Sequence, residues 1–444
     1  MNNLSDFILP RMADEHFAEL KGRVAKIIGL VMECDGPSAS IGELCAIYSG
    51  AQVVSQAEVV GFRDGRTLLM SLGELEGIRP GMEVVALGNT LSAPVGPELL
   101  GRVIDGLGQP MDDLGKLEVK ERRSIYADAP SAMQRTRISE TFHTGIRAID
   151  SFLTIGQGQR MGIFAGSGVG KSVTMGMIAR NGLAEINVIA LVGERGREVR
   201  EFIEKDLGPE GLARSVVVVA TSDQPSLVRL KASFLATTVA EYFRDQGKQV
   251  LLMLDSTTRL AMAQREIGLA VGEPPTTKGY TPSVFAMIPK LLERAGNSDK
   301  GSITGLYTVL VEGDDMDDPI ADTVRSVLDG HIVLSRALAS RNHYPAIDVL
   351  SSVSRCRTDV ASDELKSLTN PLLSSLATYQ KAEDMIRIGA YSHGSDPEID
   401  QAIKQHPPLL KFLQQNLNEG SENIDGLKTL EEINRLTVQK PTQT

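Results

Sequence analysis

A glycine-rich octapeptide restricts the folds open to this chain more than any other stretch of it. The sequence AGSGVGKS at 165–172 follows an apolar run at 160–165 that is typical of a strand, and a helical pattern at 172–181 comes after it. Strand, glycine-rich turn and helix together are the context that a phosphate-binding P-loop requires. Glycine lets successive backbone N–H groups point at phosphate oxygens, and the helix N-terminus adds a favourable dipole. The predicted loop residues are Ala165, Gly166, Ser167, Gly168, Val169, Gly170, Lys171 and Ser172.

Two side chains of the octapeptide suit a nucleoside triphosphate. Lys171 would reach the β- and γ-phosphates, and the Ser172 hydroxyl would ligate Mg²⁺. The strict pattern begins with glycine, whereas this chain has Ala165. Because that position requires small size more than unusual dihedral angles, we interpret the stretch as a P-loop rather than as a glycine-rich turn without function.

An aspartate ends a second apolar run, QVLLMLD at 249–255. An acid at the end of a buried strand has the form of a Walker B element, in which Asp255 would hold Mg²⁺ through water. Such acids are also common as simple caps of strands. The presence of the P-loop favours the metal-binding interpretation.

A charged stretch, GERGREV at 193–199, follows a third apolar run at 186–192. A carboxylate at the C-terminal edge of a strand beside a P-loop could polarise a water for in-line attack on the γ-phosphate, and we assign this role to Glu194. Arg195 could contact phosphate or couple the site to a neighbour. The alternative interpretation is a solvated turn, and it suits the charged residues after Arg195, such as Arg197 and Glu198, best.

The composition disfavours several other classes of protein. Lys and Arg number 46 against 57 Asp and Glu, and this net charge of −11 argues against a non-specific nucleic-acid binder. Three cysteines cannot form a disulfide framework, so a reducing compartment is expected, and the six histidines show no metal-ligand spacing. The N-terminus lacks the apolar run of a signal peptide, and no stretch approaches the ~18 apolar residues of a membrane span. We expect a soluble protein that stays where it is made.

Turn signals and apolar periodicity divide the chain into four parts. An N-terminal segment, 1–22, could contain a small amphipathic helix or be a loosely held terminus. Short β-like runs broken by Gly, Pro and Asp predict a small barrel or sandwich over 23–88. Residues 89–359 begin with a linker rich in Gly and Pro and then alternate strands with helices, which indicates a parallel sheet covered on both faces. Helical periodicity predicts a helical domain over 360–444.

Particular elements are also predicted within these parts. The first barrel strand is expected at 24–32 and a helix at 197–207. The predicted helices of the C-terminal domain are 363–366, 372–388 and 397–417.

A mixed polar and apolar stretch, HYPAIDVLSSVSR, ends the sheet-forming part at 343–355. Taken from the residues alone, Arg355 is most simply a structural ion-pair partner. Tyr344, which precedes a proline, is an ordinary turn aromatic.

These motifs together resemble those of the export ATPases of type III secretion. The resemblance rests on AGSGVGKS, GERGREV, HYPAIDVLSSVSR and two long stretches that begin LLMLDSTTRLAMAQ and VEGDDMDDPIADTV, and it extends from about Gly22 to the end of the chain. This family includes the flagellum-specific ATPase and its injectisome counterpart, and it is similar to the catalytic subunits of rotary ATP synthases.

The resemblance implies an α/β fold with three parts and an assembled ring. These are a six-stranded N-terminal β-barrel, a RecA-like P-loop NTPase core and a C-terminal helical domain, in a homohexamer. It supports Mg²⁺-dependent ATP hydrolysis by Lys171, Glu194 and Asp255. It also implies that Arg355 is an arginine finger for the neighbouring subunit, a role worth ~10³–10⁵ in rate. By the same resemblance, Tyr344 packs on adenine.

Three functions compete at this point. The favoured one is flagellar export, in which ATP is used to release substrates from chaperones and to load them into the export gate. The second is the same task in an injectisome, for virulence effectors. The third, a Rho-like RNA-dependent ring ATPase, is disfavoured because the N-terminal part is acidic and lacks a basic, aromatic stacking surface.

The resemblance also implies partners and a location. The partners would be further copies of this chain, a stator-like regulatory protein, a central stalk protein, and export chaperones with their substrates at the helical domain. The N-terminal segment would meet the stator-like protein or the membrane surface. Nucleic acid is not among them. The expected location is the cytoplasm, peripheral to the inner membrane at the export gate.

Overall fold

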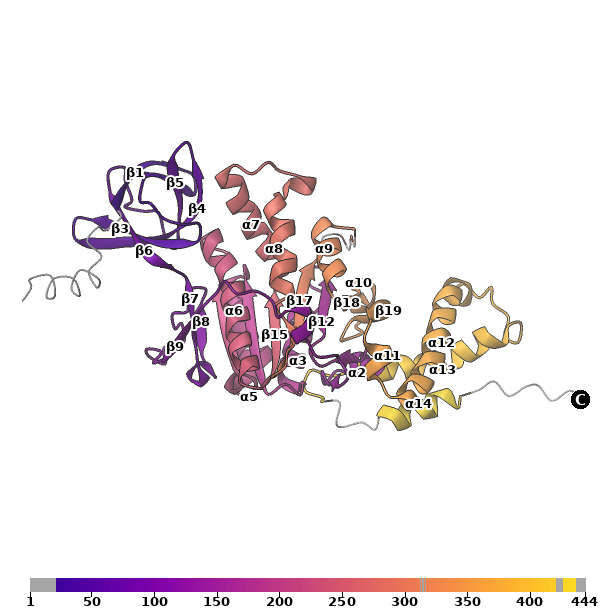
Figure 1. Ribbon diagram of the computed structural model, residues 1–444. Helices are drawn as coiled ribbons and strands as arrows, with labels where there is room; N and C mark the ends of the chain where they lie inside the picture. Colours follow the sequence, from indigo (N-terminus) through magenta and orange to yellow (C-terminus); the bar gives the residue numbers. More distant parts are fainter. Residues whose placement is uncertain (1–20, 312, 314, 316, 421–425, 437–444) are drawn as a thin grey trace, which may run out of the picture.

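The computed structural model describes residues 21–311, 313, 315, 317–420 and 426–436. Figure 1 shows three parts in a row: a barrel in indigo, a central sheet flanked by helices, and a group of helices in yellow. The small helix or loose terminus predicted within 1–20 lies outside the described residues.

Six strands close into a barrel, in the order β1-β2-β5-β4-β3-β6. Their bounds are Lys21–Ile28 (β1), Val31–Asp35 (β2), Glu43–Ser49 (β3), Gln52–Arg63 (β4), Arg66–Ser71 (β5) and Glu83–Thr90 (β6). Met32, Ile47 and Val59 belong to the hydrophobic cluster of these strands. The strand pattern alone left a sandwich open, and the six-stranded barrel implied by the resemblance is confirmed.

The strand predicted at 24–32 is wrong. These residues form a hairpin of β1 and β2 that turns at Gly29 and Leu30. Gly29 has a φ of 57°, in the left-handed region that glycine enters without a steric penalty. The turn was hidden because apolar residues continue through it: Ile28 and Leu30 are 48% and 41% exposed.

A nine-stranded sheet forms the centre of the molecule. Eight strands follow the order β19-β18-β12-β17-β15-β13-β14-β8, and β16 pairs with β17. Their bounds are Val103–Asp105 (β8), Arg160–Ala165 (β12), Ile186–Val192 (β13), Ser215–Ala220 (β14), Gln249–Asp255 (β15), Gly296–Asn297 (β16), Ser302–Leu310 (β17), Gly330–Leu334 (β18) and Ile347–Ser354 (β19). The strands from β18 to β8 are parallel, as predicted, whereas the edge strand β19 is antiparallel to β18.

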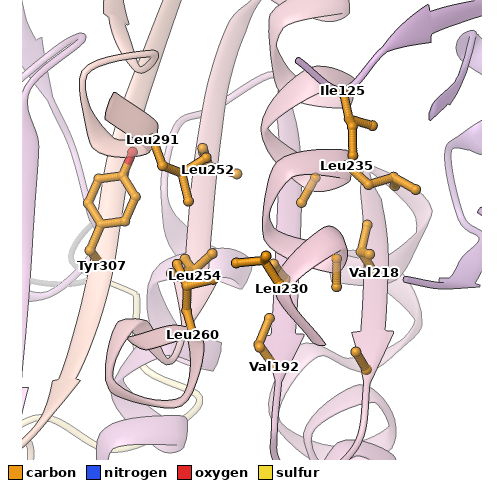
Figure 2. Packing of buried hydrophobic residues seen from close by; sticks show 14 of the residues in the cluster. Ile125, Val192, Val218, Leu230, Leu235, Leu252, Leu254, Leu260, Leu291 and Tyr307 are labelled. Carbon is orange, nitrogen blue, oxygen red and sulfur yellow. The ribbon is translucent and has the colours of Figure 1, made fainter. Parts of the chain in front are cut away.

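Helices cover both faces of this sheet. Along β13, Val188, Ala190 and Val192 pack into one hydrophobic cluster, and the residues between them pack into another. Figure 2 shows the first cluster, where Leu230 and Leu235 lie against the strands. Its helices are Ser226–Asp245 (α6), Thr257–Val271 (α7), Pro282–Leu292 (α8) and Pro319–Val327 (α9). The opposite face holds Arg147–Phe152 (α2), Lys171–Asn181 (α3), Gly196–Glu201 (α4), Phe202–Leu207 (η3) and Gly208–Ala213 (α5).

The helix predicted at 197–207 is two elements with different hydrogen bonding. α4 is an α-helix, and η3, which continues it, is a π-helix. Val199, Phe202 and Leu207 are all buried against the sheet. A π-helix inserts extra backbone within an apolar pattern, so the periodicity of the sequence does not reveal it.

The C-terminal part consists of Asp363–Arg387 (α12), Pro397–Leu413 (α13) and Gly426–Asn434 (α14). The helices predicted at 363–366 and 372–388 are one helix, because α12 continues through Pro371. Proline removes one hydrogen bond, but the buried residues Thr369 and Leu372 hold the helix on both sides of it. The helix predicted to reach 417 ends at Leu413, where the chain turns to contact α2.

Short elements lie between and within these three parts. They are Ser92–Val95 (β7), Pro97–Leu99 (η1), Glu121–Ser124 (β9), Ala132–Gln134 (η2), Thr141–Phe142 (β10), Ile155–Gly156 (β11), Thr277–Gly279 (η4), Arg336–Ser340 (α10) and Arg357–Val360 (α11). Within the described ranges, no helix combines the length and the apolar character that crossing a membrane would need.

Candidate nucleotide site

The octapeptide joins β12 to α3 at the carboxyl end of the parallel strands. Ala165 is the last residue of β12 and pairs with Leu310 and Leu334 of the two neighbouring strands. It therefore has strand geometry, which explains why alanine can replace glycine there. Gly168 and Gly170 have φ of 76° and 97°, values that favour glycine. Gly170 is the N-cap of α3, so the loop curls in front of a helix N-terminus, where phosphate binds well.

Lys171, the first residue of α3, lies between two carboxylates. Its Nζ is 3.3 Å from Oε1 of Glu194 and forms an ion pair with Oδ1 of Asp255. All three side chains are largely buried. Burial opposes the positive charge, but Asp255 and Glu194 outweigh this effect and raise the pKa of Lys171. The structure thus brings together three predicted side chains from the ends of β13, β15 and the P-loop.

Asp255 lies at the end of β15 and is 2% exposed. Its Oδ1 accepts a 2.7 Å hydrogen bond from Oγ1 of Thr308, a residue of β17. The sequence analysis missed Thr308, because a threonine within an apolar strand gives no signal of its own. A buried carboxylate held by a charged and a neutral donor has a fixed orientation, which a metal ligand needs.

The donor set around Asp255 fits Mg²⁺. A carboxylate and the hydroxyl of Ser172, which is exposed at the start of α3, are the hard oxygen ligands that Mg²⁺ prefers. No group of three or more His, Cys, Asp or Glu side chains that could hold a metal ion occurs among the described residues. Mg²⁺ usually combines one or two protein ligands with substrate phosphates, so a sparse donor set agrees with a nucleotide-bound metal.

Glu194 lies two residues after the end of β13, and its side chain is 15% exposed. Burial raises the pKa of Glu194; the charge of Lys171 opposes this, and the charge of Asp255 adds to it. A carboxylate with a raised pKa accepts a proton more readily, which is what a general base for water requires.

Arg195 points away from this group. Its side chain is 81% exposed and its Nη1 lies 3.6 Å from Oε1 of Glu198 on the same turn. Within the protomer, it is not brought to the P-loop with the other predicted residues. Of its two predicted roles, the exposed Arg195 side chain is compatible with a contact to a neighbouring copy of the chain.

Tyr344 lies beside the P-loop. A Cβ atom added to Gly170 would lie 3.6 Å from the tyrosine ring, so the ring borders the N-terminus of α3. Tyr344 is 41% exposed and lines a cavity of about 1000 Å³ together with Gly170 and Val173. An aromatic face beside a P-loop suits the base of a nucleotide.

Arg355 follows β19 at the opposite end of the sheet from the P-loop. Ser354 pairs with Gly330 at the start of β18, whereas Leu334 at the end of β18 pairs with Ala165. Positions 330 and 334 are separated by roughly 13 Å at the usual rise of a strand. Arg355 is exposed, and its guanidinium has no ion pair or hydrogen bond to the described residues. It is therefore not the structural ion-pair partner that the sequence alone suggested.

Arg259 of α7 is a second residue that the sequence analysis missed. Its side chain packs on Gly193, where an added Cβ atom would lie 2.9 Å from Cβ of Arg259. Its buried Nε has no hydrogen-bond partner among the described residues. A cationic group beside the residue before Glu194 adds positive charge to the pocket where phosphates are expected.

The fold and this site together define a P-loop nucleotide-binding protein in which an aspartate and a glutamate lie in reach of the P-loop lysine. Three family models match it: the ATP synthase alpha/beta family β-barrel domain at residues 24–88, the nucleotide-binding domain of the same family at 145–354, and the T3SS EscN ATPase C-terminal domain at 361–432.

Curated relatives and solved structures agree with these matches. The chain is 56% identical to the flagellum-specific ATP synthase of Bacillus subtilis over 92% of this chain and 94% of the relative. It is 49% identical to the type 3 secretion system ATPase of Xanthomonas euvesicatoria over 93% of each. The assembled ATPase EscN of enteropathogenic E. coli superposes with a TM-score of 0.88 at 46% identity, over 94% of this chain and all of EscN.

The chain therefore belongs to the type III secretion and flagellar export ATPases of the ATP synthase alpha/beta family, as its motifs predicted. It is accordingly a nucleotide-hydrolysing enzyme.

Proposed function

We propose that this chain hydrolyses Mg²⁺-ATP to drive protein export through a type III secretion apparatus, with flagellar export as the assignment favoured over an injectisome. The observation that carries the proposal is the buried group of Lys171, Glu194 and Asp255 at the P-loop. Such a group binds a triphosphate, orients a metal and accepts a proton from water, and these are the tasks of an ATPase.

The side chains would act in sequence on the bound triphosphate. Lys171 would leave its carboxylate partners for the phosphate oxygens, which makes the Asp255 carboxylate available to the metal. Ser172 and Asp255 would hold Mg²⁺, which would supply positive charge to the phosphates. Glu194, which is held near the same lysine, would orient the attacking water and take its proton.

The site of one copy is completed by a second copy in this proposal. Arg355 lies too far along the sheet to serve its own P-loop, and it is exposed and without ion-pair partners in the described part of the chain. The solved structure of EscN is of the assembled ATPase. We infer a homohexameric ring in which Arg355, and with it the exposed Arg195, faces the neighbouring copy.

The apparatus is assigned from the relatives. Those from Bacillus subtilis, Treponema pallidum and Salmonella typhimurium are named flagellum-specific ATP synthases, at 56%, 51% and 49% identity. The injectisome alternative rests on the relative from Xanthomonas euvesicatoria and on EscN. Loss of flagella but not of effector secretion in a strain that lacks the gene supports the first assignment, and the reverse phenotype supports the second.

The proposed partners follow from the same relatives. EscN was also solved in complex with its central stalk EscO, so a stalk protein is proposed for this chain. A stator-like regulator, export chaperones with their substrates, and a membrane export gate complete the set, at the cytoplasmic side of the inner membrane.

A mixing experiment tests the shared site. Glu194→Gln should retain ATP binding but lose hydrolysis by orders of magnitude, and Arg355→Ala should lower turnover. When the two variants are mixed, some interfaces pair an intact Glu194 with an intact Arg355, so part of the activity should return.

The matched control mixes Glu194→Gln with Lys171→Ala. Both changes lie on the same side of the site, so no site in the mixed ring has Lys171 and Glu194 intact together and no activity should return. Activity per mole should also rise with protein concentration in the wild type. Failure of the first mixture to recover, together with activity independent of concentration, would refute the shared site.

A further inference from the structure

The chain that leaves α13 turns back against the nucleotide-binding part. Residues 412–419, which we call the 412–419 segment, are held there by Arg147 of α2, a residue that is 5% exposed. Its Nε donates to the carbonyl of Phe412 at 3.0 Å, and its Nη2 donates to the carbonyl of Gln414. Its Nη1 pairs with the carboxylate of Glu419. One buried guanidinium thus fixes both ends of the segment.

Gln415 binds the segment to two loops of the nucleotide-binding part. Its backbone N–H donates to the carbonyl of Tyr344 at 3.0 Å. Its Oε1 accepts from the backbone N–H of Arg147 at 2.9 Å, and its Nε2 donates to the carbonyl of Gly145 at 2.8 Å and to that of Glu419 at 2.5 Å. Both amide protons are in use, so the Gln415 side chain has no donor left for a ligand. Its effect on a ligand must be indirect.

The 412–419 segment and Tyr344 line the same cavity. Its lining includes Gly170 and Val173 at the start of α3, the Tyr344 ring, and Gln415 with Arg147 behind it. A triphosphate bound at Lys171 would direct the rest of its nucleotide past Tyr344 into this space. The hydrogen bonds of Gln415 thus join the 412–419 segment to the loop of Tyr344 and to Arg147 at the wall of this cavity.

We propose that Arg147 and Gln415 are positioning residues for the nucleotide base. They hold the 412–419 segment and the loop of Tyr344 together, and so keep the pocket at the width that the base requires. The proposal rests on the proposed ATPase function. Because Lys171 and Ser172 hold the phosphates from another element, losing these contacts should weaken binding of the base and leave binding of the phosphates intact.

The test compares two ligands that share phosphates and differ in the base. Isothermal titration calorimetry with Mg²⁺ would measure the Kd of a non-hydrolysable ATP analogue and of inorganic tripolyphosphate. In Gln415→Ala, and separately in Arg147→Lys, the Kd of the ATP analogue should rise about tenfold, as expected for the loss of a buried hydrogen bond. The Kd of tripolyphosphate should not change.

Asn418→Ala is the matched control, since Asn418 is an exposed residue of the same segment; it should bind both ligands as the wild type does. Equal weakening of both ligands in Gln415→Ala would show a general structural defect and overturn the proposal. Unchanged binding of the ATP analogue in both variants would overturn it as well. A wild type that binds neither ligand would instead remove the proposed function, and the two failures are thus distinguishable.

Discussion

Asp255 receives donors from two different elements, Lys171 of α3 and Thr308 of β17. If nucleotide draws Lys171 toward its phosphates, as proposed, Thr308 is the donor that remains. The hydroxyl would then keep the Asp255 carboxylate oriented for the metal. This makes a residue without catalytic chemistry of its own relevant to metal binding.

Thr308→Val tests this role because valine keeps the shape and removes the hydroxyl. We expect the Mg²⁺ concentration for half-maximal ATPase activity to rise by about tenfold, since a buried hydrogen bond to a charged group is lost. Thr237→Val is the control: its hydroxyl donates to the carbonyl of Ser233 within α6. An unchanged Mg²⁺ dependence in Thr308→Val would contradict the role.

Among the larger elements, α3 and η3 approach each other closely at Gly176. A Cβ atom added there would lie 2.6 Å from Cβ and 2.7 Å from the carbonyl oxygen of Asp206. Gly176→Ala should therefore force apart the helix that carries Lys171 and the π-helix that follows Glu194. We expect a loss of about 1–3 kcal/mol in stability, measured by thermal unfolding, together with slower ATP hydrolysis.

The control for this change is Gly196→Ala. Gly196 begins α4, and nothing lies within 4 Å of a Cβ atom added to it. Alanine there should leave the unfolding temperature unchanged or raise it slightly, because alanine favours a helix over glycine. If Gly176→Ala has the same unfolding temperature as Gly196→Ala, the close approach of α3 and η3 does not limit the stability of the protein.

The loop after the edge strand β8 is closed by a pH-sensitive ion pair. Arg102 donates to both carboxylate oxygens of Asp112, at 2.7 and 2.9 Å. This pairing, assisted by backbone N–H groups and opposed by burial, lowers the pKa of Asp112 to about 2 from an ordinary 3.8. Since the folded pKa is the lower one, the contribution to stability is complete at neutral pH and is lost as the pH falls from about 4 through 2.

Asp112→Asn should therefore lower the unfolding temperature at pH 7, and the difference from the wild type should shrink as the pH falls below 4. Thermal unfolding followed by circular dichroism over this pH range measures the effect. Asp113→Asn, a change at the exposed neighbour of Asp112, serves as the control. A difference that stays constant from pH 7 to pH 3 would rule out the ion pair as its source.

The sequence predicts elements well where burial is continuous. The runs at 160–165 and 186–192 coincide with β12 and β13, because a strand covered on both faces has an uninterrupted aliphatic pattern. The P-loop and Asp255 could be found for the same reason, since the P-loop follows such a strand and Asp255 ends another. Edge strand β8, only three residues long, leaves no comparable pattern and forms because the chain passes beside β14.

Other features depend on contacts between distant residues. Thr308, Arg259 and Gln415 are common residue types in ordinary surroundings, and only the folded chain brings them to the site. The helix through Pro371 is a similar case, because buried residues beside the proline outweigh its local preference.

At the scale of the whole molecule, a buried group of polar side chains ties the barrel to the central sheet. Nζ of Lys231 on α6 lies 2.6 Å from Oε1 of Glu58 on β4, and the Tyr126 hydroxyl donates to the same oxygen at 3.0 Å. The side chains of Lys231 and Glu58 are 3% and 6% exposed. Burial lowers the pKa of Lys231, with Glu58 opposing this effect. The three residues come from three separate stretches of chain.

Lys231→Met should leave the Glu58 carboxylate buried without its cation and cost about 3–5 kcal/mol. Adding Glu58→Gln to that variant should recover part of the loss, because a neutral amide costs less to bury. Chemical denaturation of the two single variants and the double variant gives the coupling energy. Additive losses would mean that the pair does not join the barrel to the sheet.

The position of Arg355 has a genetic consequence for cells that carry a mutant copy of the gene beside the normal one. If each copy lends its guanidinium to the next one in the ring, a copy damaged only at Arg355 still folds and binds nucleotide, and it silences the site of its neighbour. An allele that encodes such a copy would then lower activity in the rings that it shares with normal copies, whereas an allele that prevents folding would leave those rings to the normal copies. Each damaged copy would silence one site, so the share of inactive sites would equal the share of damaged copies.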